Sequence, residues 1–344
     1  MSASPVQNAI RRLAAGESLS ADDTAAALDV VMRGEATPAQ IAALLVALRV
    51  KGETADEVAG GARALRHAMV RLQAPNPDGL VDTCGTGGGR IPTFNISTAA
   101  ALLAAGAGAR VAKHGNRSFT SMCGSADVLE ALGVHIEVTV DVMRHALENA
   151  GIVFMFAPLM HPAMKHVGPV RRELAIPTVM NILGPLANPA GAGRQVVGVA
   201  DEGRAPLLAD ALATLGSVHA LVVYGEPGMD EISPMGITRV REVLDGRVRQ
   251  WEIDPQRFGL GDSMAAEIQG GDPAQNAAIV MEVLRGKRRD GARSAVLLNA
   301  AAAIYVAGRS SGYEEALAIA QEALDDGAGL QALERLQRAT APPS

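Results

Sequence analysis

Apolar side chains recur at the spacing of three and four residues that is typical of helices over the first 73 residues. Val6, Ile10 and Leu13 share one face of the first run. Helix-start signals precede the three later runs, at Ser20, at Thr37-Pro38 and at the capping box Thr54-Ala-Asp-Glu57. The pattern predicts four short helices, which we expect to pack on a later segment or on another subunit.

The pattern changes after the turn-rich stretch 75–79. Short apolar runs then alternate with helical patterns, and we predict strands at 80–84, 109–112, 152–156, 195–200 and 220–224. Such alternation indicates a largely parallel sheet. Residues 157–189 are rich in Pro, Arg and His, so we expect an insertion that leaves the sheet and returns. From about residue 272 the pattern is helical, and 341–344 is expected to be a frayed tail.

Composition and charge exclude several classes of protein. A chain of 344 residues favours about two domains, and 48% hydrophobic residues with 37 glycines indicate a tightly packed α/β protein. The net charge of −6 and the absence of a Lys/Arg block argue against a nucleic-acid partner. The longest apolar runs, 99–109 and 295–307, fall short of the roughly 20 residues that a membrane span needs. Neither a signal peptide nor a membrane segment is expected.

Cys84 and Cys123 are the only cysteines. Two cysteines can form neither a disulfide framework nor a four-thiolate metal site, so we expect a reducing, cytoplasmic location.

A glycine-rich loop, Gly85-Thr-Gly-Gly-Gly89, follows the first predicted strand. Glycines let backbone N–H groups turn toward an anion and let a phosphate approach closely. The spacing matches neither the dinucleotide fingerprint nor a P-loop, so a tight turn is the alternative. Asn95-Ile-Ser97-Thr98 then opens an alanine-rich helix. Its hydroxyls are suited to capping that helix, to binding the same anion, or to ligating Mg²⁺.

A second polar loop follows the strand at 109–112. Lys113, His114, Asn116 and Arg117 surround a glycine there, and Gly124-Ser125 opens the next helix. The carboxyl end of a parallel strand is where α/β sheets bind ligands. Two such loops point to a substrate that carries more than one phosphate. His114 fits either a ligand contact or an ordinary loop side chain.

Further candidates lie later in the chain. Asp230-Glu231 follows the strand at 220–224, and Mg²⁺ bridging to phosphates would relieve the repulsion between these carboxylates; a solvated acidic turn is the alternative. His161 and His166 stand five residues apart, which is poor spacing for zinc on a helix. A guanidinium of Arg171 or Arg172 would suit a carboxylate ligand, or else both are surface charges on a helix.

Together these segments resemble the anthranilate phosphoribosyltransferase family. The resemblance rests, in the family's order and spacing, on seven motifs: Gly85-Thr-Gly-Gly88, Asn95-Ile-Ser-Thr98, Lys113-His-Gly-Asn-Arg117, 124–133, His161-Pro-Ala-Met-Lys165, 181–186 and Asp230-Glu-Ile-Ser233. It implies an α/β fold with a small α-helical domain, formed by 1–73 with an inserted segment at about 160–188. The larger α/β domain, 79–157 and 190–340, would carry a mostly parallel sheet. The resemblance also implies a cytoplasmic homodimer that pairs through the helical domains.

The implied reaction is attack of the anthranilate amine on C1′ of phosphoribosyl pyrophosphate, with Mg²⁺ as cofactor. The implied phosphoribosyl pyrophosphate site is Gly85, Thr86, Gly87, Gly88, Thr93, Asn95, Ser97, Thr98, Lys113 and Ser125. The implied anthranilate site is Gly85, His114, Asn116, Arg171, Gly184 and Pro185. Ser97, Asp230 and Glu231 would bind the metal. Lys113 and Arg171 would act electrostatically, and no general base is required because the amine is already a free nucleophile.

The chain departs from the family's pattern in two places. Gly89 stands where Asp is common, and Met122-Cys123 where Lys-Ser is common, which removes a carboxylate and a cation near the expected diphosphate; Arg90 is a candidate replacement for the cation. A pyrimidine nucleoside phosphorylase shares the architecture, but it would have a differently spelled phosphate loop and no His161-Pro-Ala-Met-Lys165 segment. A substrate-divergent paralogue, binding nucleic acid for example, is the third alternative, against which the acidic charge argues.

Overall fold

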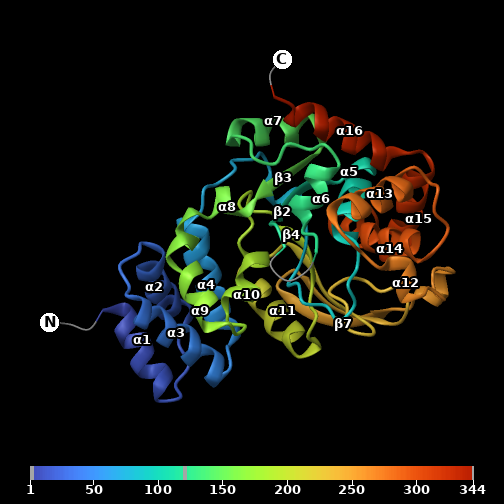
Figure 1. Ribbon diagram of the computed structural model, residues 1–344. Helices are drawn as coiled ribbons and strands as arrows, with labels where there is room; N and C mark the ends of the chain where they lie inside the picture. The colour runs from blue at the N-terminus through green and yellow to red at the C-terminus, as the bar shows by residue number, and fades with distance from the viewer. Residues whose placement is uncertain (1–3, 119–121, 343–344) are drawn as a thin grey trace.

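Four capped helices form the N-terminal part of the protein. The computed structural model describes residues 4–118 and 122–342, so the last two residues of the expected tail lie outside the described part. The helices are α1 (Pro5–Ala14), α2 (Ala21–Met32), α3 (Pro38–Lys51) and α4 (Ala55–Ala68), at the left of Figure 1. Ser4, Ser20, Thr37 and Thr54 each accept a hydrogen bond from the backbone N–H three residues on. The predicted helices are confirmed.

A seven-stranded sheet forms the centre of the larger part. Its strands are β1 (Leu80–Gly85), β2 (Arg110–Gly115), β3 (Ile152–Phe156), β4 (Arg194–Gly198), β5 (His219–Gly225), β6 (Thr238–Leu244) and β7 (Arg247–Ile253). In the order β3-β2-β1-β4-β5-β6-β7 the first five are parallel, and β6 and β7 add an antiparallel hairpin. The predicted, mostly parallel sheet is confirmed, but the hairpin was not predicted.

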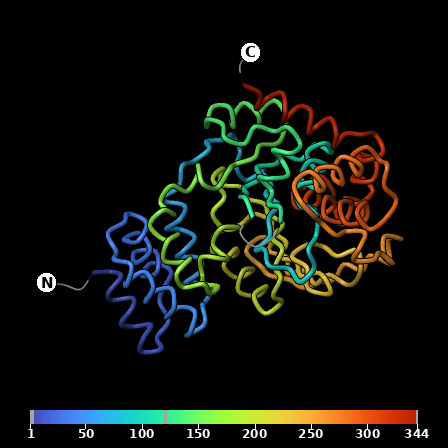
Figure 2. Tube along the Cα trace, in the orientation of Figure 1, coloured from blue at the N-terminus to red at the C-terminus, as the bar shows by residue number. Residues whose placement is uncertain are grey.

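Strand alternation places successive side chains in two separate cores. Leu221 and Val223 of β5 belong to one core, with α5 (Ile96–Gly106) and α14 (Gly291–Val306). Ala220 and Val222 point the other way, into a core that includes α11 (Ala205–Thr214) and the N-terminal helices. Helices therefore cover both faces of the sheet (Figure 2).

Further helices complete the covering of the sheet. They are α6 (Ser125–Ala131), α7 (Val140–Ala150), α12 (Ala265–Ile268), α13 (Pro273–Leu284), α15 (Tyr313–Asp325) and α16 (Ala328–Thr340). In Figure 1, α13 to α16 gather on the side away from the N-terminal helices. Among the described residues, no helix is long and apolar enough to cross a membrane.

The segment between β3 and β4 crosses to the N-terminal helices. It forms α8 (Ala157–Met160), a 3₁₀ turn at Pro162–His166, α9 (Gly168–Leu174), α10 (Met180–Leu183) and a 3₁₀ turn at Gly184–Leu186. α9 packs on α3, and α10 packs on α4. Val170 and Leu183 are buried in the same core as Leu44 and Leu45 of α3. This packing holds Arg171 and Gly184 at the junction between the helices and the sheet.

The order of the strands reverses at β1. The chain runs outward from β1 to β2 and β3, then returns to place β4 on the other side of β1. A crevice outside the carboxyl ends of the strands is expected at such a reversal, and α/β proteins bind ligands there. The glycine-rich loop follows β1, and Asp230-Glu231 follows β5, so both lie at this edge of the sheet.

Candidate functional site

The glycine-rich loop after β1 wraps around the Asp230 carboxylate. Gly87 donates its backbone N–H to Asp230 Oδ2 at 2.8 Å. A Cβ at Gly85 would lie 2.6 Å from the same oxygen, so only glycine fits there without displacing the carboxylate. Gly87 and Gly88 both have positive φ, 72° and 82°, which side chains other than glycine rarely tolerate. Gly85 is thus required by its contact with Asp230, and Gly87 and Gly88 are required by their backbone conformation.

Glu231 meets the first turn of α5. Its Oε1 accepts the Ser97 backbone N–H at 3.1 Å, at the helix end where negative charge is favoured. Burial and the adjacent Asp230 charge nevertheless raise the pKa of Glu231 to about 8. Burial likewise raises the pKa of Asp230. Two neighbouring carboxylates are therefore kept in a place that disfavours their charge.

These oxygens fit a magnesium ion. Mg²⁺ prefers hard oxygen ligands, and it is commonly held by one or two carboxylates together with substrate phosphates. No group of three or more His, Cys, Asp or Glu side chains suited to a metal occurs in residues 4–118 and 122–342. Two carboxylates with the Ser97 hydroxyl close by are thus an incomplete shell, of the kind that a phosphate completes.

Lys113 lies beneath the loops rather than in them. Its side chain belongs to the end of β2, is 3% exposed, and donates to the Thr83 carbonyl oxygen. Its Nζ also lies 3.3 Å from the hydroxyl oxygens of Thr83 and Ser97. Burial lowers the Lys113 pKa, and the Asp82 charge opposes that shift. The Lys113 ammonium therefore places positive charge close to Ser97, one of the candidate metal ligands.

Asn95 braces the two polar loops. Its Nδ2 donates to the Cys123 carbonyl oxygen at 3.2 Å, while its Oδ1 accepts from Asn276 Nδ2 at 2.9 Å and from Cys123 Sγ. Thr93 pairs with Gln269 in an isolated bridge, and the Thr98 hydroxyl is buried without a hydrogen-bond partner among the described residues. Asn276, which no sequence signal indicated, is thus part of this region.

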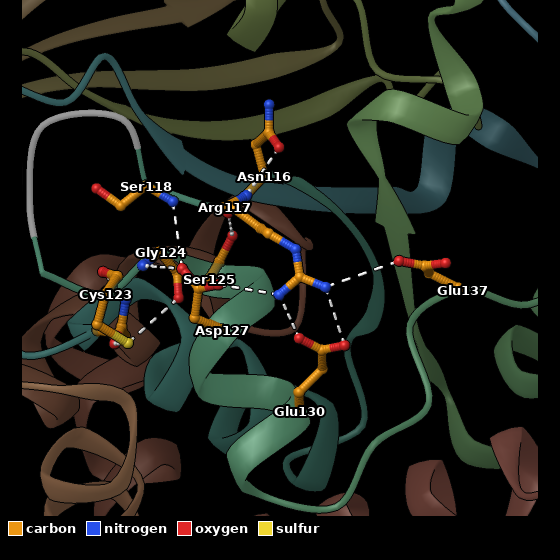
Figure 3. A network of polar contacts seen from close by, with 10 residues as sticks. Asn116, Arg117, Ser118, Cys123, Gly124, Ser125, Asp127, Glu130 and Glu137 are labelled. Atoms are coloured by element: carbon orange, nitrogen blue, oxygen red, sulfur yellow. Dashed lines mark hydrogen bonds and ion pairs between the residues drawn. The ribbon is translucent and has the colours of Figure 1, made fainter.

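Arg117 is turned toward α6. Figure 3 shows its guanidinium among three carboxylates, with contacts at 3.1 Å to Asp127, 3.0 Å to Glu130 and 3.7 Å to Glu137. These carboxylates raise the Arg117 pKa, and the hydrogen bonds that Arg117 donates to Glu130 and Asp127 are the main causes. The sequence grouped Arg117 with the ligand-facing side chains of this loop, whereas its charge is already neutralised by acidic residues nearby in the chain.

Asp127 closes the loop that ends at α6. Its Oδ2 accepts the backbone N–H groups of Gly124 and Ser118, at 2.8 and 3.2 Å. Ser125 Oγ donates to the Asn116 carbonyl oxygen at 3.4 Å, so the two ends of the loop are joined (Figure 3). Side chains at the start of α6 therefore hold the backbone of Asn116, Ser118 and Gly124.

Two imidazoles meet where the crossing segment returns toward the sheet. The rings of His114, from β2, and His161, after α8, have centroids 4.9 Å apart. Burial is the main cause that lowers their pKa values, to about 3 and about 4 respectively. Both rings are therefore neutral at physiological pH. The two neutral rings together form one aromatic surface.

Asp82 and Asn188 hold β2, the strand that carries His114, in place. Asp82 accepts the His114 backbone N–H at 3.1 Å and Asn188 Nδ2 at 2.8 Å, and Asn188 also donates to the Ala112 carbonyl oxygen. Both side chains are buried, and sequence reasoning selected neither. Burial raises the Asp82 pKa to about 6.

The crossing segment contributes Arg171, Gly184 and Pro185. Arg171 is half-buried on α9 and Arg172 is exposed, which makes Arg171 the better candidate of the two. Burial lowers the Arg171 pKa, and its guanidinium has no hydrogen bond or ion pair within the described ranges. Gly184 contacts the His114 imidazole through its backbone. An unpaired, half-buried guanidinium is suited to a carboxylate ligand.

Comparison with known proteins places this geometry in a family. The family models described as "Glycosyl transferase family, a/b domain" and "Glycosyl transferase family, helical bundle domain" match residues 77–330 and 7–69. The anthranilate phosphoribosyltransferase of Rubrobacter xylanophilus is 51% identical, with 97% of each chain covered. That of Herpetosiphon aurantiacus is 50% identical, over 97% of this chain and 99% of the relative.

Solved structures agree. The anthranilate phosphoribosyltransferase of Thermus thermophilus superposes with a TM-score of 0.91 at 41% identity, over 98% of this chain and 99% of that one. The enzyme of Saccharomyces cerevisiae in complex with PRPP and Mg gives a TM-score of 0.88 at 29% identity, over 98% of both chains. The chain belongs to the anthranilate phosphoribosyltransferases of this glycosyl transferase family.

Proposed function

We propose that this protein transfers the 5-phosphoribosyl group of phosphoribosyl pyrophosphate to the amine of anthranilate. The products are N-(5-phosphoribosyl)anthranilate and pyrophosphate, in the pathway to tryptophan. The observation that carries the proposal is the meeting of the glycine-rich loop, Asp230, Glu231 and Ser97 at the strand-order reversal, in a chain of this family. A pyrimidine nucleoside phosphorylase is the less favoured alternative, because the relatives are named for anthranilate.

The phosphoribosyl pyrophosphate site is assigned to the loops after β1 and β2. Its residues are Gly85, Thr86, Gly87, Gly88, Thr93, Asn95, Ser97, Thr98, Lys113 and Ser125. Ser97, Asp230 and Glu231 would hold Mg²⁺, which when bound neutralises charge on the departing diphosphate. Lys113 adds positive potential from below, and in a buried site it acts more strongly than in water. Backbone N–H groups of the glycine-rich loop are suited to phosphate oxygens.

The anthranilate site is assigned to the side where the crossing segment returns. Its residues are Gly85, His114, Asn116, Arg171, Gly184 and Pro185. Arg171 would pair with the carboxylate, and the neutral His114 ring would flank the aromatic ring. The amine nitrogen then forms a bond to C1′ while the C1′–oxygen bond to the diphosphate breaks, and the product amine releases a proton to solvent. Catalysis is positioning and electrostatics.

The assembly is part of the same proposal. We assign residues 1–73 and about 160–188 to a helical domain, since α9 and α10 pack on α3 and α4. The remaining α/β domain is 79–157 and 190–340. A homodimer would form through the helical domains, where Val50 of α3 leaves 80% of its surface exposed. Cys84 and Cys123 form no disulfide with each other, which is consistent with a cytoplasmic location.

A fluorescence assay of anthranilate consumption tests the reaction. We expect turnover only when anthranilate, phosphoribosyl pyrophosphate and Mg²⁺ are all present, and loss of turnover in Asp230→Asn and Glu231→Gln. Sedimentation of the same preparation tests the dimer. Phosphate-dependent release of uracil or thymine from a nucleoside, without anthranilate turnover, would instead establish the phosphorylase.

A further inference from the structure

Arg90 ends the glycine-rich loop with a guanidinium that pairs with none of the described residues. Its side chain is exposed, and it makes no hydrogen bond or ion pair with any residue in 4–118 and 122–342. Its backbone is nevertheless fixed, because Arg90 N donates to the Gly228 carbonyl oxygen at 2.9 Å. Its aliphatic stem lies close to Gly228: a Cβ at Gly228 would lie 3.0 Å from Arg90 Cδ and 3.2 Å from Cγ. Arg90 therefore lies against the loop that carries Asp230, at a glycine two residues before that carboxylate.

The other cations of this region are already engaged. Lys113 is buried and bonded to the Thr83 carbonyl oxygen, and Arg117 is held by Asp127 and Glu130 (Figure 3). Met122, 74% exposed in the loop that leads to Cys123, brings no charge. The candidate metal ligands add negative charge of their own. Within the described residues of the two loops, the guanidinium of Arg90 is the cation whose donors remain unused.

Gly89, the residue before Arg90, lies close to the Asp230 carboxylate. Gly89 has no side chain, and a Cβ there would lie 3.0 Å from Asp230 Oδ1. A ligand bound at Asp230 and Glu231 is thus open to a guanidinium on the Gly228 side. Arginine presents several N–H donors in a planar fork that matches phosphate oxygens, and such charged hydrogen bonds are about twice as strong as neutral ones.

We propose that Arg90 is a substrate-binding residue for the diphosphate of phosphoribosyl pyrophosphate, supplying from the β1–α5 loop the charge that the Met122 loop lacks. The proposal rests on the proposed function and adds a residue to it. The proposal predicts that a substitution of Arg90 affects the binding of one substrate only. Loss of Arg90 weakens binding of the diphosphate-bearing substrate and of pyrophosphate, and leaves the anthranilate site unaffected.

The test compares Arg90→Ala and Arg90→Lys with a matched control, Arg247→Ala, which removes an exposed arginine at the start of β7. For Arg90→Ala we expect the KM for phosphoribosyl pyrophosphate to rise about 10- to 100-fold, the fold-change that a charged hydrogen bond gives. Arg90→Lys should lose less, Arg247→Ala should match the wild type, and the KM for anthranilate should stay within about twofold. Equal losses in Arg90→Ala and Arg247→Ala, or no loss in either, overturn the proposal.

Calorimetry with magnesium pyrophosphate reads the same contact without turnover. A wild-type protein that binds pyrophosphate but does not consume anthranilate would refute the proposed function and leave the Arg90 prediction testable. Met122→Lys supplies a double-mutant cycle, because two cations that share one ligand couple. We expect Met122→Lys to tighten pyrophosphate binding much more in Arg90→Ala than in the wild type. Additive effects of the two substitutions would contradict a shared diphosphate.

Discussion

Adding one methyl group at Gly85 should abolish most activity without unfolding the protein. In Gly85→Ala the new Cβ would stand 2.6 Å from Asp230 Oδ2, whereas ordinary contact begins at 3.4 Å. The carboxylate must therefore move by about 0.8 Å. Its hydrogen bond from Gly87 N, now 2.8 Å, would be broken or bent by that shift.

The size of the effect follows from that displacement. A misplacement of about 1 Å at a reacting site costs about 100-fold in rate, so we expect kcat/KM to fall about 10- to 100-fold. Stability should change little, because the two closest contacts are with the end of the Asp230 side chain and the nearest backbone atom, the Asp230 carbonyl oxygen, is 3.3 Å away. Gly85→Ala should therefore keep its melting temperature within a few degrees of the wild type.

The measurement is steady-state anthranilate consumption, with thermal unfolding of the same samples. Gly312→Ala is the matched control: Gly312 is extended, with φ of −164°, and a Cβ there meets nothing within 4 Å. We expect this variant to behave as the wild type. A Gly85→Ala protein that keeps kcat/KM within about threefold would refute the inference that the loop positions the Asp230 carboxylate.

Three further predictions concern ionisable groups. Glu242 is fully buried; burial raises its pKa, but hydrogen bonds from His219, Arg249, Tyr305 and Trp251 lower it to about 2. The ionised Glu242 therefore stabilises the fold above about pH 4.5, and this stabilisation is lost toward pH 2. In urea unfolding, Glu242→Gln should lower the free energy of unfolding by about 2–4 kcal/mol at pH 7 and by much less at pH 2. His114 and His161 should stay neutral down to about pH 5 in NMR titrations, while the unfolded chain titrates near 6.5; folded-state titration near 6.5 would contradict their burial. Glu231→Gln should be inactive yet melt higher than the wild type at pH 8 without Mg²⁺, because it removes a buried charge whose pKa is raised to about 8; a lower melting temperature would contradict this.

The predictable part of the fold is the part whose signals are local. The four N-terminal helices were indicated by their apolar spacing, and three of them also by helix-start signals; the five parallel strands were indicated by apolar runs that are buried on both faces. The missed hairpin also carried a signal. Residues 238–242 alternate in burial, and Asp245-Gly246, both with positive φ, is a favoured two-residue hairpin turn. The polar outer strand, exposed at Arg247 to Gln250, obscured it.

The candidate site divides in the same way. The glycine-rich loop and Asp230-Glu231 could be selected from the sequence, because each follows an apolar strand. Asn276 could not be selected, because its hydrogen bond to Asn95 joins residues that are 181 positions apart in the sequence. Arg117 shows the converse limit. Its place in the polar segment that begins at Lys113 suggested a ligand contact, but only the structure reveals that α6 presents Asp127 and Glu130 to it.

The electrostatics of the site argue that it is built for occupancy rather than for stability. Burial raises the pKa values of Asp230 and Glu231 and lowers that of Lys113, so every one of these groups is held where its charged form is disfavoured. A stable empty fold would have replaced them with apolar side chains, as buried ion pairs often allow. A bound divalent cation would stabilise the charged forms of Asp230 and Glu231, and a bound diphosphate would stabilise the charged form of Lys113. The buried charges that destabilise the empty site therefore favour a ligand that carries a metal ion and phosphate together.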